Sequence, residues 1–197
     1  MSIIYNRKLI FIHNAKTCGT SISEFFGVER GHHSIMQYHN ELQSDFDKYN
    51  SFMVVREPVD RFLSAWNMIT SPDNKDTFLQ EKDKYSQFLA NPNDAFSDLG
   101  FLNALKKDPA MPWFWQQLEL LLISTTSSAT YNEQKTQTYV YVPTYVLFFD
   151  NFENDFATLC NRENIPFSYK GFPHKEKHEK TIEIKDLNQD SINNIFK

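Results

Sequence analysis

A single lysine lies in a short polar loop between an apolar run and a segment typical of a helix start. The run from Leu9 to His13 predicts a buried strand, and Gly19 with Thr20 marks the beginning of a helix. The first N–H groups of a helix lack intrahelical partners and lie at its positive end, so they stabilise a phosphate or sulfonate. Because Lys16 adds a full positive charge beside them, the segment predicts an oxyanion site.

The order of lysine and glycine separates this loop from the common nucleotide-triphosphate loop. In Gly-x-x-x-x-Gly-Lys-Ser/Thr the lysine follows the last glycine. Here Lys16 precedes Gly19, and Thr20 follows the glycine, which disfavours an ordinary Walker-type kinase or ATPase. The alternative is a purely structural left-handed turn at Gly19, capped by Thr20 or Ser21, with Lys16 in solvent.

A second segment carries an arginine at the end of a predicted strand. The apolar run from Ser51 to Arg56 is typical of a buried strand, and Pro58 suits the first position of the helix that follows. Ligands of open α/β sheets bind at the carboxyl ends of strands, and a guanidinium there can grip a phosphate through two parallel hydrogen bonds. Arg56 is therefore a second candidate anion ligand.

Helical spacing divides the segment after Pro58 into two faces. Phe62, Ala65, Trp66 and Ile69 fall on one face, which we expect to pack against a sheet. Three residues fall on another face: Arg61, Ser64 and Met68.

The two segments together resemble the donor-binding motifs of sulfotransferases that use 3′-phosphoadenosine 5′-phosphosulfate, in the carbohydrate-type branch. The resemblance implies that the 5′-phosphosulfate is held by Lys16, Thr17, Cys18, Gly19, Thr20 and Ser21. It implies that Arg56 and Ser64 hold the 3′-phosphate. Asn14-Ala15 departs from the usual residue-proline pair, and Cys18 stands where glycine or alanine is usual. In relatives a late loop folds over the nucleotide, so Lys175 or Lys177 is expected to add positive charge there.

Sulfuryl transfer, like phosphoryl transfer, depends mostly on positioning and on stabilising charge. Lys16 is the best candidate to neutralise the leaving phosphate, and we expect no metal. A neutral imidazole can accept the proton of an acceptor hydroxyl near neutral pH, and relatives often place a histidine shortly after the first helix. His32 and His33 fit that position, with His33 slightly favoured. A zinc site made of these two residues and His39 lacks a cysteine or acidic partner at ligand spacing.

Composition fits one domain over residues 1–197. The formal net charge of −5 argues against general nucleic-acid binding, so the anion site must be a local positive feature. Two cysteines are too few for a disulfide framework, which favours a reducing compartment. No apolar run reaches signal-peptide or membrane-span length, so we expect a cytoplasmic protein without a membrane partner.

The order of elements, with the resemblance, predicts a three-layer, P-loop-like α/β fold in which a central parallel sheet is flanked by helices. The expected strands are Leu9–His13, Ser51–Arg56 and Tyr145–Phe149, and the expected helices are Thr20–Phe26, Pro58–Ile69, Asn151 or Asn154 to Arg162, and Asp186–Phe196. Between them we expect a His-rich connection, Gly31–Leu42, and a helical middle, Thr77–Ser124, with breaks at Pro92 and at Pro109-Ala110-Met111-Pro112. The expected activity is sulfuryl transfer to a hydroxyl of a carbohydrate or other small molecule. A P-loop-type nucleotide or sugar kinase and a catalytically silent nucleotide-binding module are the alternatives.

Overall fold

The computed structural model divides the chain into two compact units, each described here by itself. The first unit comprises Met1–Val55 and Gln116–Pro173, and the second comprises Arg56–Trp115 and His174–Lys197. The residues described are 1–71, 92–107, 120–130, 133–173 and 182–196. The single domain stays a prediction.

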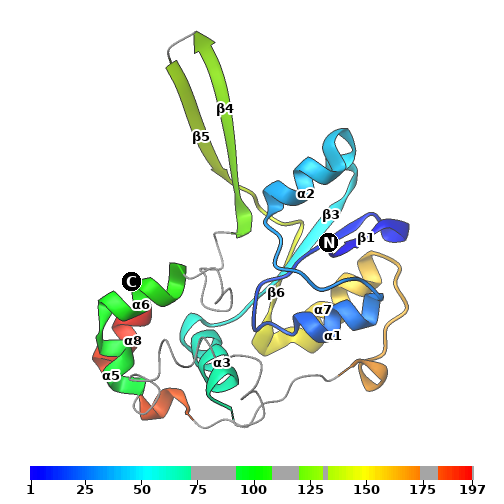
Figure 1. Ribbon diagram of the computed structural model, residues 1–197. Helices are drawn as coiled ribbons and strands as arrows, with labels where there is room; N and C mark the ends of the chain where they lie inside the picture. Colours follow the sequence, from blue (N-terminus) through cyan, green and yellow to red (C-terminus); the bar gives the residue numbers. More distant parts are fainter. Residues whose placement is uncertain (72–91, 108–119, 131–132, 174–181, 197) are drawn as a thin grey trace. The chain divides into compact units, whose positions relative to one another are not determined.

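A four-stranded, mostly parallel sheet forms the centre of the first unit (Figure 1). Its strands, in spatial order, are β1 (Ile3–Ile4), β2 (Leu9–Ile12), β3 (Asn50–Val55) and β6 (Tyr145–Phe148). Met53 of β3 pairs with Ile12 on one side and Val146 on the other, and both pairings are parallel. The predicted α/β fold is confirmed, with the addition of β1 as a short antiparallel edge.

Helices cover both faces of this sheet. Side chains of a strand alternate between faces. One face packs with α1 (Gly19–Phe26) and α7 (Phe152–Arg162) into a core that contains Phe11 and Phe52. The other packs against α2 (Ile35–Leu42), whose Tyr38 is fully buried. The first unit therefore has the three layers that the element order predicts.

Aromatic rings fill the layer between the sheet and α7. Phe156 of α7 is fully buried, and its ring lies 5.0 Å from the ring of Phe167 and 5.3 Å from that of Phe172 between centroids. It also meets Phe25 of α1 at 5.5 Å and Phe52 of β3 at 6.4 Å. Edge-to-face rings at such distances stabilise a core beyond the area they bury. Phe156 thus joins both helices of this layer to the sheet.

Two parts of the first unit differ from expectation. The segment Gly31–Leu42, expected as a connection, contains α2, which Ser34 and Gln37 start with a capping box. Leu122–Ser124, expected to be helical, lies in β4 (Leu122–Thr130), which pairs antiparallel with β5 (Glu133–Val140) as a separate ribbon. In the first case, hydrogen bonds between Ser34 and Gln37 stabilise the start of a helix. In the second, the β-branched isoleucine and threonine residues of the segment favour strand over helix.

The second unit is helical in its described part. Its helices are α3 (Pro58–Thr70), α5 (Pro92–Ser97), α6 (Leu99–Lys107) and α8 (Gln189–Phe196). Trp66 of α3 is fully buried and packs edge-to-face on Phe96 of α5 at 4.8 Å. The side chain of Asn67 donates to the carbonyl oxygen of Ile182 at 2.9 Å and accepts from its N–H at 3.1 Å. This amide attaches the segment before α8 to α3.

One expectation for α3 was wrong: its apolar face, expected to pack against a sheet, packs with side chains of α5, α6 and α8. Arg61 and Met68, which lie outside that face, are also buried, at 5% and 7% exposed, because other helices of the unit surround α3. Pro92, expected as a break in the helical middle, is the first residue of α5, a position where proline is tolerated, and the residues directly before it lie outside the described part. Most of the remaining predicted helical middle lies in residues 72–91 and 108–119, outside the described part.

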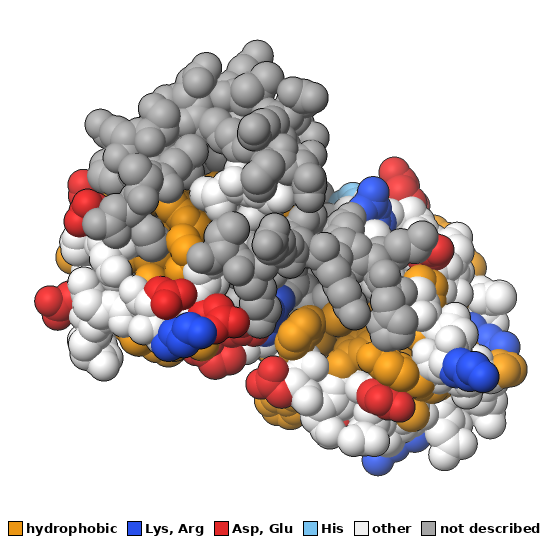
Figure 2. All heavy atoms as spheres, turned by 90° about the horizontal axis from the view of Figure 1, so that it is seen from below, with side chains coloured by type: hydrophobic (Ala, Val, Ile, Leu, Met, Phe, Trp, Pro, Cys, Tyr) orange, Lys and Arg blue, Asp and Glu red, His pale blue; other side chains and the backbone are white. Residues whose placement is uncertain are grey.

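Short 3-10 helices connect the elements: Tyr5–Arg7, Gln43–Lys48, Phe149–Asn151, Tyr169–Gly171 and Ile184–Asp186. Basic side chains lie singly or in small groups among acidic and apolar ones on the face shown in Figure 2. Within the described ranges, none of the helices is long and apolar enough to cross a membrane.

The aromatic layer predicts which phenylalanine the first unit depends on. Phe156→Ala is expected to lower the free energy of unfolding by about 3–5 kcal/mol, since it leaves a cavity between α7 and the sheet. Urea unfolding followed by far-UV circular dichroism measures the change. Phe148→Ala, at a side chain that is 60% exposed, is the matched control and should change stability by less than about 0.5 kcal/mol. Equal losses in the two variants would contradict the assignment.

Candidate functional site

The loop between β2 and α1 has an unusual backbone. Lys16 and Cys18 both adopt the left-handed conformation, each with φ of 63°, whereas Thr17 between them does not. Turns that contain left-handed residues can direct successive N–H groups toward a common side, where they bind an anion. The left-handed region costs roughly 1–2 kcal/mol for a residue other than glycine, and such strain clusters at functional sites.

Side-chain hydrogen bonds attach this loop to the sheet. The hydroxyl of Thr17, which is fully buried, donates to the carbonyl oxygen of Asn14 at 2.7 Å. The amide of Asn14 donates to the carbonyl oxygen of Val54 in β3 at 3.3 Å. The position of the loop is therefore set by two neighbouring parallel strands, β2 and β3.

Helix α1 begins directly after the loop, at Gly19. Ile22 donates its N–H to the carbonyl oxygen of Cys18 at 3.0 Å, so the helical ladder starts there. The N–H groups of Gly19, Thr20 and Ser21 precede this bond and form the positive end of the helix. With the half-buried Lys16 just before them, the loop and first turn have the parts of the predicted oxyanion site.

His13 lies between β2 and α1, and its side chain is 6% exposed. Its ring stacks on Phe11 at 5.2 Å and meets the ring of His32 at 4.3 Å between centroids. A Cβ atom added to Gly19 would lie 1.6 Å from Nε2 of His13, so only glycine fits beside this ring. Burial, with the charges of His32, Arg30 and His33 as smaller causes, lowers the pKa of His13 from 6.5 to about 3. The residue is therefore neutral at physiological pH.

The two predicted histidines occupy different environments. Nδ1 of His32 lies 3.1 Å from the carbonyl oxygen of His13. The ring of His33 packs edge-to-face on Tyr38 at 5.9 Å, and its buried Nδ1 has no hydrogen-bond partner among the described residues. Burial lowers the pKa of both histidines from 6.5, so both are neutral near pH 7.

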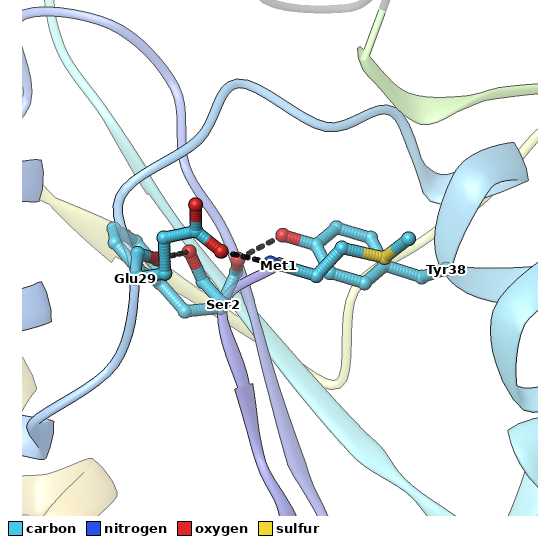
Figure 3. A network of polar contacts seen from close by, with 5 residues as sticks. Met1, Ser2, Glu29 and Tyr38 are labelled. Atoms are coloured by element: carbon cyan, nitrogen blue, oxygen red, sulfur yellow. Dashed lines mark hydrogen bonds and ion pairs between the residues drawn. The ribbon is translucent and has the colours of Figure 1, made fainter.

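Polar contacts hold the segment that leads to these histidines (Figure 3). The hydroxyl of Ser2 donates to the carbonyl oxygen of Glu29 at 2.9 Å, and the amino group of Met1 lies 3.3 Å from the Glu29 carboxylate. The phenol of Tyr38 donates to the carbonyl oxygen of Phe11 at 3.0 Å, which attaches α2 to β2. The chain on both sides of His32 is thus fixed against the first two strands.

The second predicted motif lies in the second unit. Arg56 follows β3 directly, and its Nε donates to the Asp60 carboxylate at 2.6 Å. Asp60 is itself held by its N–H, which donates to the Glu57 carboxylate at 2.6 Å in an N-terminal cap of α3. Ser64 follows Asp60 by one helical turn on the same face. Arg56 is thus held at the start of α3, and Ser64 lies at the middle of the helix, one turn beyond Asp60.

Two further cations near Arg56 were not singled out by sequence reasoning. Burial, and to a lesser degree the charge of Arg56, lowers the pKa of Arg61 to about 10. Burial and the charge of Arg61 lower the pKa of Lys106 on α6, whose ammonium donates to the carbonyl oxygen of Ile195. Helical periodicity could not reveal the burial of Arg61, because α3 is buried on more than one face.

The structure brings together Lys16 to Ser21 with His32 and His33 in the first unit, whereas Arg56 and Ser64 belong to the second. Lys175 and Lys177 lie outside the described residues. No cluster of three or more histidine, cysteine or acidic side chains suited to a metal ion occurs in the part of the chain that is described.

Comparison with known proteins gives one match. The model of a family described as the sulfotransferase family matches residues 6–183, most of the chain. No curated protein and no solved structure matches the chain.

The buried imidazole of His13 predicts a pH dependence of stability. Its pKa is about 3 in the folded chain and 6.5 in an unfolded one, so between these values the unfolded state binds more protons. The free energy of unfolding should therefore fall as pH drops below 6.5, by up to about 1.4 kcal/mol per pH unit from this group. Urea unfolding at pH 7, 6 and 5 measures the slope. His13→Ala should have a shallower slope, and His39→Ala, at an exposed histidine, should keep that of the wild type. Identical slopes in all three proteins would contradict burial of a neutral His13.

Proposed function

Since the chain belongs to the sulfotransferase family, we propose that it moves a sulfuryl group from 3′-phosphoadenosine 5′-phosphosulfate to a hydroxyl of a carbohydrate or other small molecule. Proteins of this family catalyse sulfuryl transfer in general. The observation that carries the proposal for this donor is the loop between β2 and α1. There, the left-handed residues Lys16 and Cys18 and the first turn of α1 gather positive charge and backbone N–H groups.

The 5′-phosphosulfate is assigned to Lys16, Thr17, Cys18, Gly19, Thr20 and Ser21. Thr17 and Gly19 are buried and fix the course of the backbone in the loop. Thr17 does so through its hydrogen bond to Asn14, and Gly19 through its close packing against His13. Thr20 accepts a hydrogen bond from Arg30 at 3.2 Å, which adds a cation near the same turn. A site built mostly from backbone N–H groups suits the equivalent oxygens of phosphate and sulfate.

The 3′-phosphate is assigned to Arg56 and Ser64. The loop with Lys16 follows β2, and Arg56 follows β3, which is the parallel neighbour of β2. The carboxyl ends of parallel strands meet at one edge of a sheet, where ligands of α/β folds bind. The place of Arg56 directly after β3 supports its assignment to an anionic group of the donor. Lys175 and Lys177 are proposed to add charge over the nucleotide.

Lys16 is assigned to the leaving group. In the transfer, the bond between sulfur and the bridging oxygen breaks as a new sulfur–oxygen bond forms to the acceptor. Negative charge grows on the bridging oxygen, and an ammonium beside it stabilises the transition state more than the ground state. The strained conformation of Lys16 is consistent with a side chain that must point to one place.

The acceptor proton is assigned to a histidine, and the geometry supports His32 over His33. A ring nitrogen that faces a carbonyl oxygen must carry the hydrogen, so Nδ1 of His32 is the donor to His13. Its Nε2 then holds the lone pair that can accept a proton. The lowered pKa of His32 keeps this nitrogen unprotonated near pH 7. His33, which the sequence slightly favoured, stays the second candidate.

Donor binding distinguishes this proposal from its alternatives. Isothermal calorimetry should detect 3′,5′-bisphosphoadenosine but not ATP, and EDTA should leave the affinity unchanged. Arg56→Ala should weaken binding about tenfold or more, since roughly 1.4 kcal/mol corresponds to one decade. Arg162→Ala removes an exposed guanidinium at the end of α7 and should bind as the wild type does. Binding that requires ATP and magnesium would indicate a kinase, and bisphosphate binding without transfer to any acceptor would indicate a silent module.

Turnover tests the assignment of Lys16. Lys16→Ala should lower kcat more than it weakens donor binding, because the ammonium acts mainly on charge that develops during bond cleavage. Transfer of radiolabelled sulfate at saturating donor measures kcat, with Lys48→Ala, an exposed lysine paired with Asp45, as the control. Normal turnover of Lys16→Ala at saturating donor would refute this role.

A further inference from the structure

His13 contacts both Gly19, at the start of α1, and His32, although the proposed function gives it no chemical role. We propose that His13 is a positioning residue for the transfer: its ring fixes the first turn of α1 against the end of β2, and its carbonyl oxygen orients the ring of His32. This inference rests on the proposed function, because it deepens the roles given there to α1 and His32. One residue would thereby place the donor loop and the proton acceptor relative to each other.

The contact with α1 is the first support. The ring of His13 lies so close to Gly19 that an added Cβ would fall within 2.4 Å of three of its atoms, Nε2, Cδ2 and Cε1. Behind the ring, Phe11 stacks on it with an interplanar angle of 21°. Gly19, the first residue of α1, therefore packs against the ring of His13, which in turn stacks on Phe11 of β2. A shift of the ring would displace the start of α1.

The contacts with His32 are the second support. The main chain of His13 accepts the hydrogen bond from Nδ1 of His32, and the two rings meet at 4.3 Å with an interplanar angle of 40°. One contact fixes which nitrogen carries the hydrogen, and the other limits rotation of the ring. A proton acceptor must be held in a defined direction to be efficient.

The polarity of His13 is the third support. Its Nδ1 is buried and finds no hydrogen-bond partner among the described residues. A buried polar atom without a partner lowers the stability of the folded chain, a cost that an apolar ring of similar shape would avoid. The charged and titratable groups that act on His13 are His32, Arg30 and His33, and each opposes its protonation. A neutral ring leaves the positive charge at the end of α1 to the anion.

Wild-type protein provides the first test, which needs no variant to fold. Long-range proton–nitrogen NMR of the imidazole rings should show His32 with its hydrogen on Nδ1 and a pKa below 6.5. His13 should stay neutral from pH 8 to pH 5. A hydrogen on Nε2 of His32, or ordinary titration of His13 near pH 6.5, would overturn the proposal.

Variants supply the second test. His13→Ala opens the space beside His32, so the pKa of His32 should rise toward 6.5. At a pKa of 6.5, transfer at pH 6 is about one quarter of that at pH 8, whereas the wild type should lose less. Gly19→Ala, which displaces the ring from the other side, should move the pH profile in the same direction. His39→Ala is the matched histidine control and should keep the wild-type profile. Profiles unchanged in His13→Ala and Gly19→Ala would overturn the proposal.

The two tests separate this inference from the proposed function. If the wild type neither binds 3′,5′-bisphosphoadenosine nor transfers sulfate, the proposed function fails, although the NMR result for His32 can still be obtained. If binding and transfer are normal while the NMR signals show the opposite tautomer of His32, the positioning role fails alone.

Discussion

The first unit depends on one junction, where the end of β2 meets the first turn of α1. The chain makes this junction with left-handed residues at Lys16 and Cys18, a conformation that costs energy unless other contacts fix it. Two of those contacts are hydrogen bonds, donated by the hydroxyl of Thr17 and by the amide of Asn14. The third is the packing of the His13 ring against Gly19. The positive end of α1 is thereby presented at a defined place on the sheet.

Electrostatics at this junction favours an anion over a cation. The positive end of α1 and Lys16 supply charge, while burial keeps His13 and His32 neutral. Neutral imidazoles add no second positive charge beside the proposed anion site. A neutral His32 also keeps a lone pair that can accept a proton. The proposed anion site is therefore a local positive feature of a protein whose formal net charge is −5.

Much of the fold could be predicted from local patterns, and the exceptions have physical causes. The strand before Lys16 and the helix from Pro58 were confirmed within one residue at each end, because apolar runs and terminal residues marked them. Helix α2 was missed although the spacing of Ser34 and Gln37, which form its capping box, is a sequence signal for a helix start. The roles of His13 could not be inferred, since its contacts with Gly19 and His32 depend on tertiary packing. Burial of Arg61 likewise depends on helices far away in the sequence.

The central claim is that the junction between β2 and α1 holds the 5′ end of the donor nucleotide. A crystal structure of the protein with 3′,5′-bisphosphoadenosine tests this most directly. The account predicts that the 5′-phosphate accepts hydrogen bonds from the N–H groups of Gly19 to Ser21 and from the ammonium of Lys16, with the 3′-phosphate at Arg56. A 5′-phosphate bound away from the first turn of α1 would contradict it.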